Sequence, residues 1–266
     1  MATLDLLVPQ SLRSHGVTAD EWQLRLELAA LYRLVAAQGW TEMIYNHITL
    51  RVPGPEPHFL INPYGLNYSE VTARNLVKID LEGNVLDGSD YPVNLAGFVI
   101  HGAIHAVRHD AHCVIHTHTT AGMAVACKEE GLRFDNFYSA EFFGDVGYHE
   151  FEGISTDVDE RVRLAENLGS KRVLILRNHG LVLVGQHVPA VFEDYWRLQR
   201  ACEVQMASDS MAGANQQVRP EVLDAIPRQL KKARSALEAT GVRRGQVFFD
   251  AALRRAGLEL SDLSGD

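Results

Sequence analysis

The feature that most constrains the fold of this chain is an apolar strand that ends in two histidines, at residues 114–118 (VIHTH). Side chains two positions apart on an extended strand point the same way, so His116 and His118 present two imidazoles side by side where the strand ends. Neutral imidazole nitrogen is a ligand for zinc, iron, nickel and copper. The motif alone is a weak signal, because a chain with 12 histidines can contain such a pair by chance.

A second apolar strand that ends in a histidine strengthens the prediction of a metal site. Residues 173–180 (VLILRNHG) run from four apolar positions to His179, and Gly180 allows the backbone to turn sharply afterwards. The apolar residues 181–185 are predicted to pair with this strand around Gly180. Two buried strands that each deliver histidine at the end favour a three-histidine metal site over three unrelated core residues.

The whole-chain properties exclude several classes of protein. At 266 residues the chain forms one large domain or two small ones, and its net charge of −9 argues against nucleic acid or an anionic membrane as a partner. The first residues lack the basic start of a signal peptide, and no apolar run approaches the roughly 18 residues of a membrane span. Three widely spaced cysteines are typical of reduced thiols, so we expect a cytoplasmic protein.

The order of the predicted elements indicates an α/β layer architecture. Thr18 is a plausible helix N-cap followed by acidic residues. Short strands are predicted at 48–52 and 58–61, and helices at 94–107, 121–126, 158–168 and 188–207. After a short lead-in, residues 1–212 are expected to form the main domain. Residues 213–266 are expected to form a helical appendage that is not an independent domain and could pack on a neighbouring subunit.

Seven blocks of sequence resemble the class II aldolase/adducin family. They occur in the family's order and cover about residues 20–210, with the closest similarity to the adducin-like bacterial branch. The blocks are 45–51 (YNHITLR), 63–66 (PYGL), 68–72 (YSEVT), 97–101 (GFVIH), 116–118 (HTH), 147–149 (GYH) and 174–181 (LILRNHGL).

The resemblance implies a three-layer α/β/α fold around a largely antiparallel central sheet. It also implies a homotetramer with the active site near a subunit interface, and a catalytic divalent metal. Carried over residue by residue, the implied metal ligands are His116, His118 and His179. Zinc is the first expectation for the metal and Fe(II) the alternative, since imidazole suits both.

Two departures from the family pattern bear on the chemistry. The sugar-phosphate aldolases carry a Ser-Ser-Glu segment, in which the serines hold substrate phosphate and the glutamate is the general base. Leu95, Ala96 and Gly97 occupy the matching positions here. A phosphate needs several hydrogen-bond donors, so a phosphorylated ketose is a poor substrate expectation. Because Gly97 replaces the glutamate, the general base must also come from another residue.

Other polar residues are candidates for the remaining roles. His101 lies one helical turn past Gly97 and could act in catalysis, or could fix the tautomer of a metal ligand. Tyr148 is a second catalytic candidate, although a core position with a satisfied hydroxyl is equally compatible with the sequence. Three further residues lie in segments that the family places near substrate, where purely structural roles stay open: His47, Tyr64 and Glu141.

The sequence therefore predicts a metal-dependent lyase or aldolase that acts on a small, non-phosphorylated carbonyl compound. One alternative is a non-heme iron oxygenase that decarboxylates an aryl 2-oxo acid, as the resemblance to family members of aminocoumarin antibiotic biosynthesis implies. The other alternative is a non-catalytic assembly protein, because the adducin head resembles this chain but is not known as an enzyme.

Overall fold

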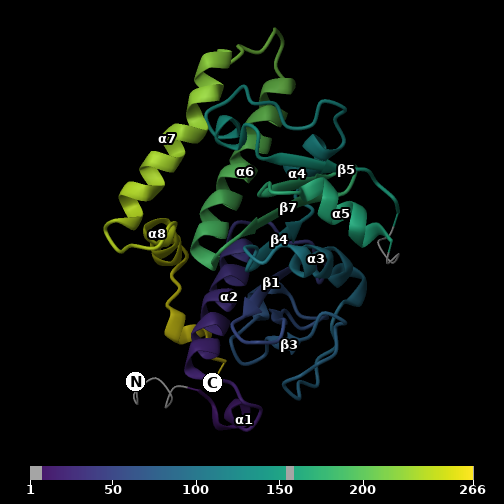
Figure 1. Ribbon diagram of the computed structural model, residues 1–266, viewed down its shortest axis with the longest axis vertical. Coiled ribbons are helices and arrows are strands. Elements are labelled where there is room, and N and C mark those ends of the chain that lie inside the picture. The colour runs from purple at the N-terminus through teal and green to yellow at the C-terminus, as the bar shows by residue number, and fades with distance from the viewer. Residues whose placement is uncertain (1–7, 154–158, 266) are drawn as a thin grey trace.

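A computed structural model describes residues 8–153 and 159–265 of the chain, with the side chains of residues 95–97 also outside the description. Part of the expected lead-in and the expected start of the helix at 158 fall outside these ranges. Figure 1 shows a central sheet with helices on both of its faces.

Seven strands form the sheet in the order β3-β2-β1-β4-β7-β6-β5. Every neighbouring pair is antiparallel except β5 and β6, which run parallel, so the predicted largely antiparallel sheet is confirmed. The strands are β1 (His47–Val52), β2 (His58–Ile61), β3 (Val77–Ile79), β4 (Cys113–Thr117), β5 (Val146–His149), β6 (Val173–Leu176) and β7 (Gly180–Gly185).

Helices complete the outer layers. The α-helices are α1 (Gln10–Arg13), α2 (Ala19–Ala37), α3 (Leu95–Val107), α4 (Thr120–Ala126), α5 (Glu160–Leu168), α6 (Val188–Asp209), α7 (Pro220–Glu238) and α8 (Gln246–Ala256). Three short 3-10 helices are η1 (Tyr68–Glu70), η2 (Ser139–Phe142) and η3 (Leu260–Leu263). The predicted N-cap of α2 is confirmed, because the Thr18 hydroxyl accepts a hydrogen bond from the Glu21 backbone N–H.

The alternation of apolar side chains along the strands creates the three layers. Ile115 of β4 faces a core shared with α2, α4 and α6, while its neighbour Val114 faces a second core shared with α3 and α5. Leu183 and Val184 of β7 divide between the same two cores. The α/β/α layering implied by the family resemblance is therefore confirmed.

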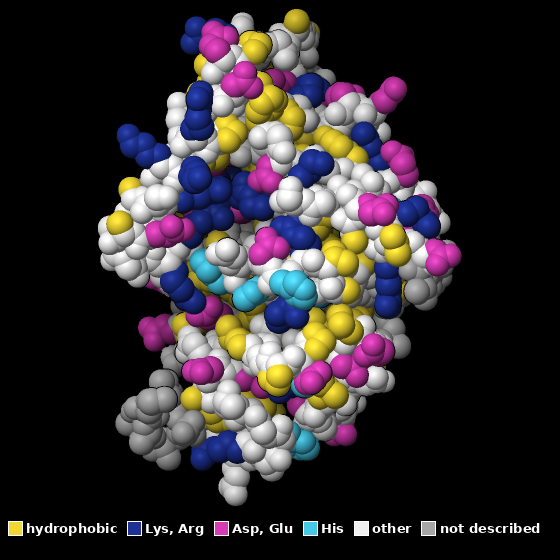
Figure 2. Space-filling model, viewed as in Figure 1, with side chains coloured by type: hydrophobic (Ala, Val, Ile, Leu, Met, Phe, Trp, Pro, Cys, Tyr) yellow, Lys and Arg dark blue, Asp and Glu magenta, His cyan; other side chains and the backbone are white. Residues whose placement is uncertain are grey.

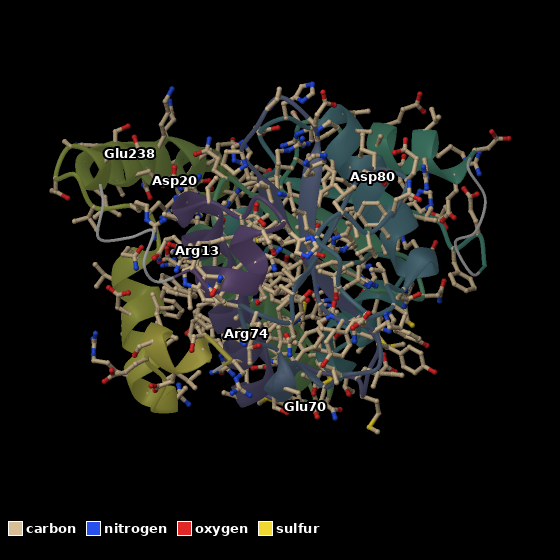
Figure 3. The ribbon with its side chains drawn as sticks, turned by 90° about the horizontal axis from the view of Figure 1, so that it is seen from below. Arg13, Asp20, Glu70, Arg74, Asp80 and Glu238 are labelled. Atoms are coloured by element: carbon tan, nitrogen blue, oxygen red, sulfur yellow. The ribbon has the colours of Figure 1, made fainter. Side chains whose placement is uncertain are left out.

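The C-terminal segment is helical. Phe248 and Phe249 of α8 pack against Phe192 of α6, whereas α7 has no buried residue and lies along the outside of the molecule. Seen from below, both helices lie on one side, with Glu238 at the end of α7 (Figure 3). The boundary at residue 212 stays a prediction. Across the described residues, no helix has the length and apolarity needed to cross a membrane.

Candidate metal centre

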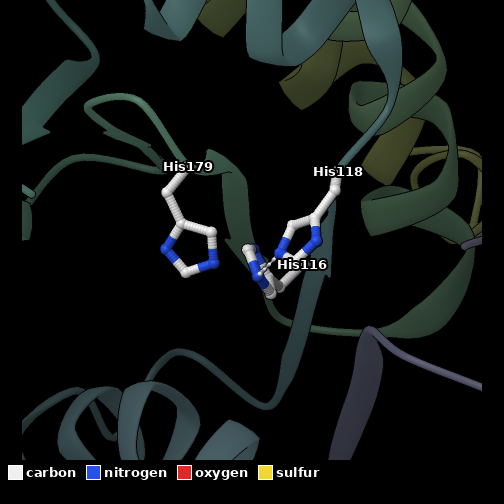
Figure 4. Close-up of side chains that lie close together, drawn as sticks. All are labelled: His116, His118 and His179. Carbon is white, nitrogen blue, oxygen red and sulfur yellow. Dashed lines mark hydrogen bonds between the residues drawn. The ribbon is translucent and has the colours of Figure 1, made fainter. Parts of the chain in front are cut away.

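The structure brings His116, His118 and His179 together. His116 lies in β4, His118 follows its last residue, and His179 immediately precedes the adjacent antiparallel strand β7. One ring nitrogen of each residue lies within 4.8 Å of the other two, and the ring centroids are 4.7–4.9 Å apart (Figure 4). The two strand ends therefore meet at one point, as the sequence predicted.

Hydrogen bonds orient two of the three imidazoles. His116 Nδ1 donates to the Leu181 carbonyl oxygen at 3.0 Å, which leaves the lone pair on Nε2. His118 Nδ1 lies 2.5 Å from Oε2 of Glu42 and is oriented by this carboxylate. The two Nε2 atoms then face each other at 2.9 Å. Two lone pairs so close repel unless a proton or a metal cation lies between them.

The surroundings favour the neutral form of two of the three rings, His116 and His179. Burial, followed by the neighbouring rings of His179 and His118, holds the pKa of His116 well below its usual value. Burial and the ring of His118 lower the pKa of His179 to about 4. Neutral imidazole is the form that binds metal, so the donor set at pH 7 fits a zinc or iron ion.

The local backbone explains how His179 reaches the other two rings. Asn178 adopts a left-handed conformation with φ of 57°, so it makes the sharp turn that the sequence assigned to Gly180. Gly180 has a different role, because a Cβ atom there would lie 2.6 Å from the Thr117 carbonyl oxygen and 3.1 Å from Cδ2 of His118. Only glycine permits this close approach of β7 to β4.

Two of the predicted site residues lie directly behind His116. His47 is opposite His116 in the register of β1 and β4, with ring centroids 5.6 Å apart. The ring of His101 on α3 lies 4.3 Å from that of His47 and is fully buried. The sequence placed both residues near the site without identifying their contact.

Thr49 links His101 to His105. Its Oγ1 lies 2.7 Å from Nδ1 of His101 and 2.7 Å from Nε2 of His105. A hydroxyl carries a single hydrogen, so it donates to one ring and accepts from the other. The tautomers of the two buried histidines are therefore coupled.

The other predicted residues have protein partners of their own. The Tyr148 hydroxyl accepts from the Leu132 backbone N–H at 3.1 Å, and the Arg177 guanidinium lies 4.3 Å from its ring centroid. Glu141 Oε1 pairs with Arg197 at 2.5 Å. Tyr64 is half-buried in the turn after β2, and its N–H donates to a backbone carbonyl. The assigned roles stay predictions.

Sequence reasoning missed Glu42. This carboxylate is half exposed and belongs to a tight turn in which the Tyr45 N–H donates to the Glu42 carbonyl oxygen. A metal-binding histidine commonly donates its other N–H to such a carboxylate. The residue lies 76 positions from His118 in an unremarkable polar segment, so no local pattern pointed to it.

Comparison with known proteins places the geometry in context. Residues 26–206 match the model of a family described as the class II aldolase and adducin N-terminal domain. A Caulobacter vibrioides protein named for class 2 aldolases is 46% identical over 215 residues, covering 80% of this chain and 84% of that protein. Mouse alpha-adducin is 48% identical over 193 residues, covering 71% of this chain and 26% of the adducin. An aldolase II superfamily structure from Pseudomonas syringae has a TM-score of 0.83 at 39% identity, covering 96% and 99% of the two chains.

Proposed function

The chain belongs to the class II aldolase and adducin family, and from this premise we propose that it is a metal-dependent carbon–carbon lyase acting on a small, non-phosphorylated carbonyl compound. The observation that carries the proposal is the convergence of three imidazoles, each with one ring nitrogen within 4.8 Å of the others. Three neutral nitrogen donors leave room for a substrate oxygen at a catalytic ion.

His116, His118 and His179 would hold the divalent metal, with zinc as the first choice and Fe(II) as the alternative. When bound, the ion would supply Lewis acidity to the substrate carbonyl. The protein's own groups prepare the site. The Leu181 carbonyl and the Glu42 carboxylate orient two of the rings, and His179 is held neutral by burial.

His101 and Tyr148 are the two residues that the sequence offers for the proton transfer, since Gly97 has no side chain to take a proton, and we propose Tyr148 as the catalytic one. The complete burial of His101 behind His47 supports a positioning role for it. Tyr148 carries a hydroxyl whose lone pair is already engaged by the Leu132 N–H, so it remains able to donate its own proton. His47, Tyr64 and Glu141 are the proposed substrate-binding residues.

The substrate class follows from the residues that replace the family's phosphate-binding serines. Leu95 and Ala96 have no hydroxyl to donate to a phosphate. We further propose a cytoplasmic homotetramer, in line with the family resemblance, that has small molecules rather than membranes or nucleic acids as partners.

A second candidate function is a non-catalytic assembly protein. The 48% identity to mouse alpha-adducin favours it, although this chain matches only 26% of that protein's length. The two candidates differ in what they require of the histidine cluster, because an assembly role does not depend on a metal with an open coordination position.

Metal analysis combined with an activity screen tests the proposal. The purified protein should contain a divalent metal and cleave non-phosphorylated aldol compounds, and His116→Ala should lose both properties. His109→Ala is the matched control, because His109 is exposed on the loop after α3. Metal-free protein, or full activity in His116→Ala, would refute the proposal that the protein is a metal-dependent lyase. Iron with oxygen uptake on aryl 2-oxo acids would indicate the oxygenase instead.

A further inference from the structure

A hollow of about 360 Å³ lies between α7, the turn that joins β7 to α6, and the segment that leads into α8. Figure 2 shows a dense group of basic side chains left of centre, over the region beside α7. The charged residues that line this hollow are five arginines and two acids: Arg108, Arg172, Arg234, Arg243, Arg244, Asp110 and Glu238.

Two of these arginines are fully engaged by the protein. Arg108 forms a paired contact with Asp110 at 2.7 and 2.8 Å and donates to two backbone carbonyls. Arg243 pairs with Glu27 at 2.8 Å and also donates to Gln246. These contacts fix the walls of the hollow and leave these guanidinium groups little capacity for a ligand.

Arg172 and Arg244 are only partly engaged. Both donate to the buried carboxylate of Asp194, and Arg172 also pairs with Asp145 at 2.5 Å. Each guanidinium carries five N–H donors, so both retain donors for a further acceptor. Asp194 holds the two guanidinium groups side by side, and together with Asp145 it balances their positive charges.

Arg234 is the exception among the five. Within the described parts of the chain its guanidinium has no hydrogen bond and no ion pair, although the side chain is half-buried. Burial lowers its pKa, and the positive charges of Arg172 and Arg244 lower it further. The carboxylates of Asp194 and Asp145 act in the opposite direction, but both are already bound by Arg172 and Arg244. Arg234 is therefore a partly buried cation without a direct acceptor, an arrangement that an anionic ligand would stabilise.

The backbone holds this arrangement in place. Gly245 has a φ of 76°, and a Cβ atom there would lie 2.3 Å from the Pro189 carbonyl oxygen in the first turn of α6. The segment that carries Arg243 and Arg244 therefore rests directly on the N-terminal end of a 22-residue helix. That end of the helix favours negative charge as well.

We propose that this hollow binds the phosphoryl group of a small phosphorylated compound or free phosphate, with Arg234 as the principal ligand. Arg172 and Arg244 supply additional N–H donors. The planar fork of arginine matches two oxygens of a phosphate, and the volume exceeds what the ion alone needs. The site is separate from the histidine cluster and does not depend on the proposed lyase activity.

Calorimetric titration of the full-length protein tests the proposal with three probes at constant ionic strength: inorganic phosphate, pyrophosphate and glycerol phosphate. We expect saturable binding, weakened at least about tenfold by Arg234→Gln, since a charged hydrogen bond is lost. Lys231→Gln removes the same charge from an exposed position of α7 and should bind like the wild type. Tighter binding of glycerol phosphate than of phosphate would identify an ester as the ligand class.

A second variant keeps the test valid if Arg234→Gln fails to fold. Arg234→Lys keeps the charge but loses the fork, so it should also bind phosphate more weakly than the wild type. Protein treated with a chelator should retain phosphate binding, which separates this result from the fate of the metal centre. The proposal is overturned if none of the probes binds saturably, if both Arg234 variants bind like the wild type, or if Lys231→Gln weakens binding as much as Arg234→Gln.

Discussion

The Nε2 atoms of His116 and His118 lie 2.9 Å apart, while the Nδ1 atom of each ring is engaged by an oxygen atom. The two nitrogens that face each other are thus those left to share a proton or a cation. His179 adds a third ring at the same point. This relationship makes the cluster a candidate metal centre rather than a chance gathering of polar side chains.

Removing a ring from the cluster should remove the metal. We expect His179→Ala to purify with far less zinc or iron than the wild type, as measured by elemental analysis, because two imidazoles alone hold the ion weakly. A chelator should lower the melting temperature of the wild type and leave that of His179→Ala unchanged. Equal metal content in the variant and in the control His109→Ala would contradict the assignment.

Removing the carboxylate behind His118 should weaken metal binding without abolishing it. Glu42→Gln loses the anionic acceptor that orients the ring, so we expect an affinity about 10- to 100-fold lower in a competition titration with a chromophoric chelator. Glu56→Gln, on the exposed loop between β1 and β2, is the matched control. An unchanged affinity in Glu42→Gln would show that this contact has no influence on the metal.

A methyl group at position 180 should distort the cluster. Gly180→Ala places a Cβ atom 2.6 Å from the Thr117 carbonyl, and backbone cannot move aside cheaply. We expect lower metal affinity and a lower melting temperature than in Gly54→Ala, where no atom lies within 4 Å of the added group. Identical behaviour of the two variants would mean that the strand ends are less closely packed than described.

The hydroxyl of Thr49 should stabilise the fold. Thr49→Val leaves His101 and His105 without their shared partner in a buried position, at a cost of about 1–3 kcal/mol in the free energy of unfolding. Urea denaturation measures the loss. Thr41→Val, at an exposed position, should change little. A loss no larger than in this control would show that the network adds nothing to stability.

Acid should destabilise the protein through His105. Burial, followed by the charge of Arg51, lowers the pKa of this ring to about 3 from its usual 6.5. The unfolded chain therefore binds a proton that the folded chain does not, and stability present above pH 6.5 is lost as the pH falls toward 3.

The contribution of this one ring is measurable as a slope. Between pH 6.5 and 3, the free energy of unfolding should fall less steeply with pH in His105→Gln than in the wild type. The difference in slope should be up to about 1.4 kcal/mol per pH unit, measured by urea denaturation at several pH values. The control His109→Gln alters an exposed ring and should keep the wild-type slope. A slope in His105→Gln equal to that of the wild type would assign the acid sensitivity to other groups.

The sequence by itself determined many of the elements and identified the three histidines of the cluster. Thr18 starts α2 because an N-cap depends only on residues within one turn, and His116 and His118 face the same way because alternation is a property of a single strand. The seven family blocks added the largely antiparallel three-layer fold, which the sheet order confirms.

Only the tertiary structure decided which distant groups meet. The Glu42 carboxylate reaches His118 through a turn conformation, and Thr49 lies between His101 and His105 because β1 packs under α3. Arg234 faces two other guanidinium groups because α7 lies beside the start of α6. Local patterns encode the conformation of neighbouring residues. Contacts between remote residues depend instead on strand register, turn geometry and helix packing, which are set by the burial of the whole core.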